Sequence, residues 1–102
     1  MLDAARRIGR YVEGLSRDQF VTRDMAFDAV CLNLIRIGEA ARFLGDDAKA
    51  ALPTVRWPDV VTMRNRIAHG YKSLEEEIIW RTATESVRDL ANAIRAFLGR
   101  GV

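Results

Sequence analysis

The chain has 102 residues, a length for one domain. Hydrophobic residues make up 49% and charged residues 29%, which excludes an intrinsically disordered chain. Sixteen lysines and arginines against fourteen acidic residues give a formal net charge of +2. That charge permits a nucleic-acid partner without requiring one.

No apolar run approaches the roughly 18 residues of a membrane span. No secretion signal opens the chain, and the single cysteine, Cys31, fits a reducing compartment, so we expect a cytoplasmic protein. A chain this short buries a thin core, which makes dimerisation an expectation.

The first half of the chain predicts two main helices. Residues 2–15 carry apolar side chains three or four apart. Ser16 and Gln19 have the form of a capping box, which predicts a short helical turn before Thr22. Thr22 is the predicted N-cap of a long helix with Gly45 as its C-cap. Its apolar seam is Phe27, Val30, Leu34, Ile37, Ala41 and Leu44, and beside this seam lie Cys31, Ile35 and Gly38, which a partner chain could cover.

Residues 46–58 contain both prolines and predict a short helical turn followed by a connection. Pro58 suits the first position of a third helix, because its ring presets the helical backbone angle. This helix is predicted to run to about His69, where Gly70 ends it.

The last helix is predicted to open with a second capping box at Ser73 and Glu76 and to end at Gly99. Its inward positions are Ile79, Thr82, Val87, Leu90, Ile94 and Phe97. Because no segment has the two-residue period of a strand, we predict an all-α antiparallel bundle of four to five helices.

The single histidine lies in the segment richest in candidate catalytic groups. Within eight residues at the end of the third helix stand Arg64, Asn65, Arg66, His69 and Tyr71. The carbonyl end of a helix favours a protonated imidazole. An imidazole can move a proton at a 2′-hydroxyl or a leaving oxygen, while a guanidinium stabilises charge gathering on phosphorus. The pair therefore suits cleavage of RNA.

Arg64 and His69 are five residues apart, about 140° and 7.5 Å on an ideal helix, so only a curled arginine side chain brings them together. Catalysis by a general acid together with a general base requires two titrating groups, and each chain has only one histidine. A symmetric dimer with two facing His69 side chains would supply both groups.

A purely structural interpretation competes with this one: His69 caps a helix, and Arg64 and Arg66 are solvated surface charges. Glu39, in the middle of an apolar helix, either pairs with Arg64 or Arg66 or lies on the outer face. One histidine and one distant cysteine (Cys31) predict no metal site of nitrogen and sulfur ligands.

At residues 64–71, RNRIAHGY, the sequence resembles the HepT family of HEPN-domain ribonuclease toxins. The signature of that family is Arg, four residues, His, any residue, Tyr. Residues 33–41, NLIRIGEAA, look like its second-helix signature, and Pro53, Trp57 and Trp80 fall where the family carries a proline and two tryptophans. By their residue type, the two tryptophans are also expected to be core or interface aromatics.

The resemblance covers nearly the whole chain and implies one HEPN domain over residues 1–102. Two departures accompany it. The first helix is shorter than is general in the family, as if clipped at its N-terminus, and residues 72–75 lack an aspartate often found there.

The resemblance implies a metal-independent, cofactor-free ribonuclease toxin that acts as a homodimer. Arg64 and His69 are then catalytic, with Asn65, Arg66 and Glu39 in support. It also implies a type VII toxin–antitoxin pair with an MntA-like nucleotidyltransferase that transfers AMP to the motif tyrosine, here Tyr71. The added phosphate would compete with RNA for Arg64 and Arg66.

Two other functions remain open from the sequence. In the first, a non-catalytic helical dimer presents substrate or nucleotide to a neighbouring nucleotidyltransferase. In the second, a basic helical module binds nucleic acid without cutting it, and the near-neutral charge argues against that one.

Overall fold

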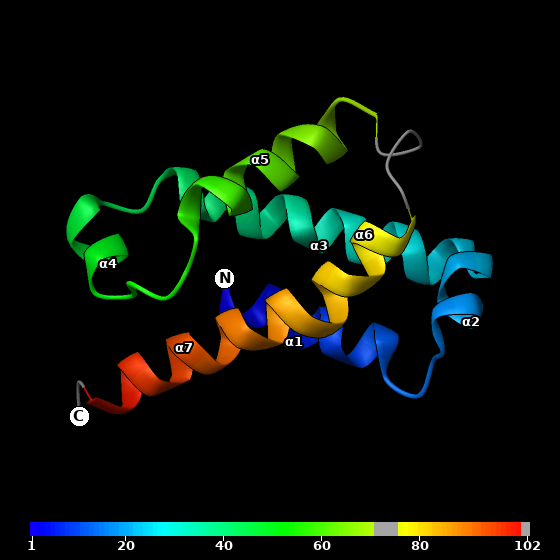
Figure 1. The fold of residues 1–102 in the computed structure, drawn as a ribbon, viewed down its shortest axis with the longest axis horizontal. Coiled ribbons are helices and arrows are strands. Elements are labelled where there is room, and N and C mark those ends of the chain that lie inside the picture. Colours follow the sequence, from blue (N-terminus) through cyan, green and yellow to red (C-terminus); the bar gives the residue numbers. More distant parts are fainter. Residues whose placement is uncertain (71–75, 101–102) are drawn as a thin grey trace.

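The structure, a computed structural model, describes residues 1–70 and 76–100, and these ranges contain helices and no strands (Figure 1). In chain order the α-helices are α1 (Leu2–Val12), α2 (Arg17–Thr22), α3 (Asp24–Arg42), α4 (Asp46–Ala50), α5 (Trp57–Ala68), α6 (Glu76–Arg81) and α7 (Val87–Arg100). A π-helical segment, η2 (Thr82–Ser86), joins α6 to α7 into one helical run. The all-α prediction is confirmed, with six helical runs in the described ranges instead of four or five.

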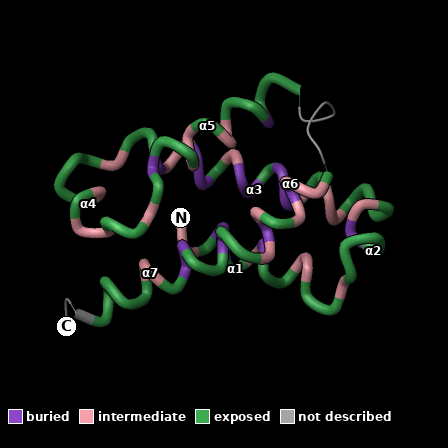
Figure 2. The backbone as a smooth tube through the Cα atoms, in the orientation of Figure 1, coloured by how far each residue is buried: buried purple, intermediate pink, exposed green. Residues whose placement is uncertain are grey.

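The long helix α3 is the centre of the molecule. Helix α5 packs along one side of α3, and α1 packs along the other side and also contacts α7 (Figure 1). The buried positions gather where these helices face one another (Figure 2). The fully buried side chains of the core include Ile8, Phe20, Val30, Ile67 and Ile79. No helix within the described ranges is long and apolar enough to span a membrane.

The predicted capping box of α2 is confirmed. The Ser16 Oγ accepts a hydrogen bond from the Gln19 backbone N–H at 3.2 Å, and the Gln19 Oε1 accepts one from the Ser16 N–H at 2.9 Å. The first helix ends at Val12, three residues earlier than predicted. Gly14 follows with φ of +74°, a left-handed backbone that turns the chain toward α2.

Both predicted caps of α3 are wrong. Thr22 is the last residue of α2, because its hydroxyl donates backward to the carbonyls of Asp18 and Gln19 at 3.0 and 3.1 Å. Arg23 takes the N-cap position. At the other end, Phe43 is the C-cap in a right-handed conformation, so no left-handed residue is needed, and Gly45 instead precedes α4.

The last helix departs from its prediction at its end. Helix α7 continues through Gly99 to Arg100, and Phe97, predicted to point inward, is 42% exposed because α7 extends past its neighbours (Figure 1). Val87 and Leu90 are buried as predicted. Ser73, the other predicted cap, lies outside the described residues.

Candidate active site

Helix α5 carries the predicted site and is anchored at both ends. At its start, Trp57 is buried and its indole Nε1–H donates to the carbonyl of Lys49 at 3.3 Å. Pro58 lies in the first turn as the second residue of α5, one position later than predicted, because the helix already begins at Trp57. Near its end, Ile67 is buried in the core. Trp57 is therefore a core aromatic; Trp80 is also packed, with its ring 5.3 Å from that of Phe20 between centroids.

Arg64 lies on α5 where that helix comes closest to α3. A Cβ atom added to Gly38 would lie 2.1 Å from the Arg64 Cβ and 2.6 Å from its Cγ. No side chain fits at Gly38, so the glycine sets the distance between the two helices. Arg64 of the same chain therefore covers Gly38. The prediction that a partner chain could cover this residue is wrong.

The Arg64 side chain is mostly covered, with 23% of its surface exposed, and its guanidinium is held from two directions. Nη2 lies 2.5 Å from the Glu39 Oε1, and Nη1 donates to the Asn65 Oδ1 at 3.0 Å. Nε is buried and has no hydrogen-bond partner among the described residues. The guanidinium is therefore fixed in place while one of its donors is unsatisfied.

Glu39 settles one alternative that the sequence left open. It contacts Arg64 and not Arg66, and its Oε1 also accepts from the Arg42 Nη1 at 3.2 Å. Glu39 therefore lies between two guanidinium groups, those of Arg64 and Arg42.

His69 is the C-cap of α5, and its backbone N–H donates to the Asn65 carbonyl at 3.1 Å. Its side chain is exposed, and within the described residues its ring makes no hydrogen bond. Gly70 follows with φ of +129°, a backbone angle that favours glycine. Tyr71 lies outside the described residues.

The structure brings Arg64, Glu39 and Asn65 into one group. His69 stands beyond that group at the end of the same helix, and among the described residues no hydrogen bond joins its side chain to that of Arg64. Arg66 is exposed and has no ion pair with a described residue. One chain thus presents a fixed cation, an accessible imidazole and a free cation along the last turns of α5.

Cys31 is outside this chemistry. It is 2% exposed, and burial raises the pKa of its thiol to about 12, with Asp28 adding to the rise. Cys31 is therefore a packing side chain of the core and not a reactive thiol. Within the described ranges, no three histidine, cysteine or acidic side chains lie together as ligands for a metal ion.

The sequence did not identify Gly38 as the residue that places Arg64, or Arg42 as the second partner of Glu39. The sequence did contain a signal for Gly38, because a glycine in the middle of a long helix destabilises that helix unless another backbone approaches there. For Arg42 the only signal was weak, namely the three-residue spacing of Glu39 and Arg42 on one helix.

Comparison with known proteins agrees with the resemblance in the motif. The model of the family described as "Ribonuclease HepT-like" matches residues 1–97. The chain is 28% identical over 87 residues to "Putative RNase MJ1380" of Methanocaldococcus jannaschii, covering 85% of this chain and 80% of that protein. It is 25% identical over 88 residues to "Probable ribonuclease HepT" of Thermococcus cleftensis, covering 86% and 80%. No solved structure matches.

Proposed function

Because the chain belongs to the HepT-like ribonuclease family, we propose that it cleaves RNA with Arg64 and His69 as its catalytic pair. The observation that carries the proposal is the placement of two complementary groups on one helix. Arg64 is fixed by Gly38 and Glu39, whereas the His69 imidazole is free in solvent at the helix end. A fixed cation and an accessible proton carrier are what phosphodiester transfer needs.

In the proposed reaction, the neutral imidazole of one His69 accepts the proton of a 2′-hydroxyl. The resulting oxygen attacks the adjacent phosphorus, and the bond from phosphorus to the 5′-oxygen breaks. A protonated imidazole returns a proton to that leaving oxygen, so the products are a 2′,3′-cyclic phosphate and a 5′-hydroxyl. Arg64 stabilises the charge on the phosphoryl oxygens during the transfer.

Two imidazoles in different protonation states require two chains, so we assign the reaction to a homodimer. An apolar groove beside the site supports this assembly. It has a volume of about 510 Å³ and is bordered by Val60 and Met63 of α5, Leu34 of α3 and Leu90 of α7. A second copy seated there would lie against the helix that carries Arg64 and His69.

We assign the chain the toxin role in a type VII toxin–antitoxin pair, with an MntA-like nucleotidyltransferase as antitoxin and Tyr71 as the AMP acceptor. The position of Tyr71 in the sequence supports this assignment, since it follows His69 by two residues. A phosphate attached there would meet the exposed charge of Arg66 and would compete with the RNA backbone for it.

The test uses protein made without its neighbouring genes, so that Tyr71 is unmodified, and a fluorescent RNA oligonucleotide in buffer with EDTA. The native chain should cut the RNA and leave a 2′,3′-cyclic phosphate, whereas an oligonucleotide with 2′-deoxy sugars should stay intact. His69→Ala should lower the rate by about 10²–10⁴-fold. Arg23→Ala removes an exposed arginine far along the chain from the motif and should leave the rate unchanged.

If the native chain leaves varied RNA substrates intact, the proposal is wrong. In that case the alternative is a non-catalytic dimer that presents substrate or nucleotide to a nucleotidyltransferase. This alternative predicts that His69→Ala leaves the activity of the nucleotidyltransferase unchanged.

A further inference from the structure

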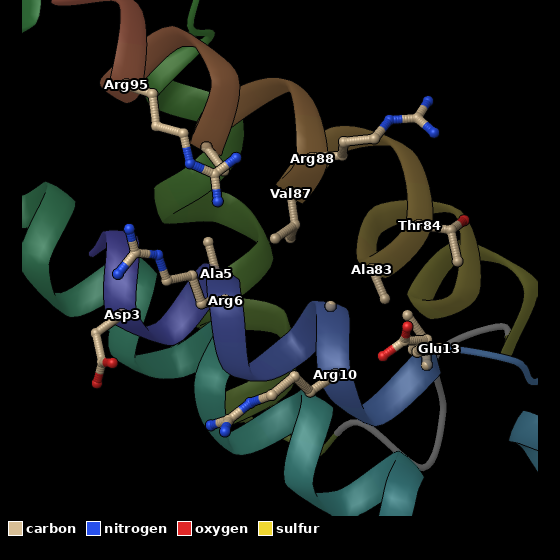
Figure 3. Close-up of a pocket in the computed structure, with 13 residues that line it drawn as sticks. Asp3, Ala5, Arg6, Arg10, Glu13, Ala83, Thr84, Val87, Arg88 and Arg95 are labelled. Carbon is tan, nitrogen blue, oxygen red and sulfur yellow. The ribbon is translucent and has the colours of Figure 1, made fainter. Parts of the chain in front are cut away.

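A second group of arginines lies away from the candidate active site. Helix α1 on one side and η2 with α7 on the other enclose a groove of about 670 Å³. Arg6 and Arg10 of α1 and Arg88 and Arg95 of α7 line it (Figure 3). Since α5 packs on the opposite side of α3 from α1, this groove is separate from Arg64 and His69 (Figure 1).

The arginines of the groove have almost no counter-charge. Arg6, Arg10 and Arg88 form no ion pair or hydrogen bond with any described residue, and Arg95 donates only to the neutral Asn92, at 3.4 Å. Of the two acidic residues in the lining, Asp3 is paired with Arg7, which is not part of the groove.

The other acidic residue, Glu13, stands at the end of the groove beside Ala83, away from Arg6 and Arg95 (Figure 3). The formal net charge of +2 therefore hides a local excess of positive charge.

Arg95 reaches from α7 toward Ala5 of α1, while the guanidinium groups of Arg6, Arg10 and Arg88 point outward along the groove (Figure 3). Four like charges thus line one groove, and an anion bound among them would reduce their mutual repulsion. A guanidinium offers paired N–H donors that fit phosphate oxygens, so a phosphate is the anion that suits this position.

The floor of the groove indicates how its ligand is recognised. It is made of small apolar residues, namely Ala5, Gly9, Ala83, Val87 and Ala91. The floor offers no large aromatic side chain for base stacking and no amide for base pairing, so recognition rests on the charges at the edges. Residues 3–12 of α1 extend about 14 Å, enough for more than one phosphate of a nucleic-acid strand.

We infer that this cationic groove binds the phosphate backbone of RNA outside the segment being cleaved. The inference rests on the proposed ribonuclease function, which makes RNA the polyanion that the protein meets. Contacts of this kind are independent of base sequence and depend strongly on salt. They hold the substrate on the protein and leave the chemical step at Arg64 and His69 unchanged.

The test measures binding separately from cleavage. Every protein carries His69→Ala, so that a fluorescein-labelled single-stranded RNA remains intact, and its fluorescence polarisation is followed at several salt concentrations. The double variant Arg6→Gln with Arg95→Gln should weaken binding about tenfold at moderate salt and reduce the slope of log affinity against log salt by about 1.4. Arg10→Gln with Arg88→Gln is a second, independent pair that should act in the same direction.

The matched control is Arg23→Gln with Arg81→Gln, two exposed arginines outside the groove, which carries the same loss of charge. This control should bind RNA within about twofold of the parent, since only general charge is lost. Equal weakening by the control and the groove variants would overturn the inference, as would unchanged binding in both groove variants.

Failure of the inference is distinguishable from failure of the proposed function. With His69 restored, the groove variants should raise the KM for RNA cleavage and keep kcat. If the native chain cuts RNA and the groove variants cut it with unchanged KM, the groove is wrongly assigned and the function stands. If the native chain never cuts RNA but the groove variants still lose RNA binding, the proposed ribonuclease function is wrong and the assignment of the groove stands.

Discussion

Gly38 of α3 and Arg64 of α5 are in such close contact that the position of Arg64 depends on the absence of a side chain at residue 38. A Cβ built at Gly38 lies closest to the Cβ of Arg64. The Arg64 Cβ is attached directly to the backbone, so it cannot rotate away as the end of a long side chain could. The spacing of two helices and the placement of a functional group are thus determined by one glycine.

Gly38→Ala should therefore destabilise the protein, although alanine favours a helix by about 1 kcal/mol over glycine. The added methyl forces α3 and α5 apart, an overpacking that costs about 1–3 kcal/mol, and it moves Arg64. We expect a net loss of about 1 kcal/mol in urea unfolding and a cleavage rate reduced by about 10²-fold.

Gly9→Ala is the matched control for that variant. Gly9 is a helical glycine of α1 with nothing within 4 Å of its added Cβ. This variant should gain about 0.5–1 kcal/mol of stability and keep kcat, because Gly9 lines the cationic groove and not the candidate active site. If Gly38→Ala behaves in the same way as Gly9→Ala, the close contact does not place Arg64.

Glu39 should act as a positioning residue for Arg64. Glu39→Gln keeps an oxygen near the guanidinium but removes its charge, and Glu39→Ala removes both. We expect the cleavage rate to fall by about tenfold in the first and by about 10²-fold in the second, because a displaced Arg64 stabilises the reacting phosphate less well. Single-turnover rates with excess protein measure this effect.

Glu85→Gln is the comparison for Glu39, since Glu85 is an exposed partner of Arg81 one helical turn away. It should alter neither rate nor stability measurably. Rates that are equal in Glu39→Ala and the native chain would remove Glu39 from the site.

The sequence predicted the helices well because their apolar spacing is regular, but it misplaced boundaries that depend on local hydrogen bonding. Thr22 has the side chain of an N-cap, yet its hydroxyl bonds backward to the preceding turn and ends α2 instead. Phe97 follows the inward spacing of α7, but no neighbouring helix reaches that far. Periodicity shows which face is apolar and not whether a partner covers it.

The site was predictable in composition and not in arrangement. The residues of the motif are next to one another in the sequence, so Arg64 and His69 could be found directly. Besides its neighbour Asn65, the residues that hold Arg64 come from α3, more than twenty residues earlier, and only folding brings Gly38 and Glu39 to it. The cationic groove was hidden for the same reason, since its arginines come from the two ends of the chain.

The buried thiol of Cys31 gives the protein a sensitivity to high pH. The pKa of the thiol is near 9 in the unfolded chain and about 12 in the fold. Between these values the unfolded state releases the proton and the folded state keeps it, so rising pH favours unfolding. The free energy of unfolding should fall by about 1.4 kcal/mol more between pH 8 and 10 in the native chain than in Cys31→Ala.

Urea unfolding at both pH values, with the native chain and Cys31→Ala side by side, measures this difference. The other titrating groups are the same in both proteins and cancel. Parallel pH profiles would mean that the thiol is not buried as described.

Modification of Tyr71 is tested by intact-mass spectrometry. Protein made together with an MntA-like nucleotidyltransferase should gain the mass of one or more AMP units and lose the ability to cut RNA. Tyr71→Phe should keep its original mass and stay active under the same conditions. A mass increase that persists in Tyr71→Phe would place the modification elsewhere, and no increase in the native chain would remove AMP transfer from the account.

The most direct measurement of the central claim is a double-mutant cycle on the rate of RNA cleavage with Arg64→Ala, His69→Ala and both together. Groups that act on one phosphodiester bond as a unit are non-additive, so the double variant should be about as slow as the slower single variant. Rate losses that multiply would show two groups working independently, and a native chain without ribonuclease activity would contradict the account altogether.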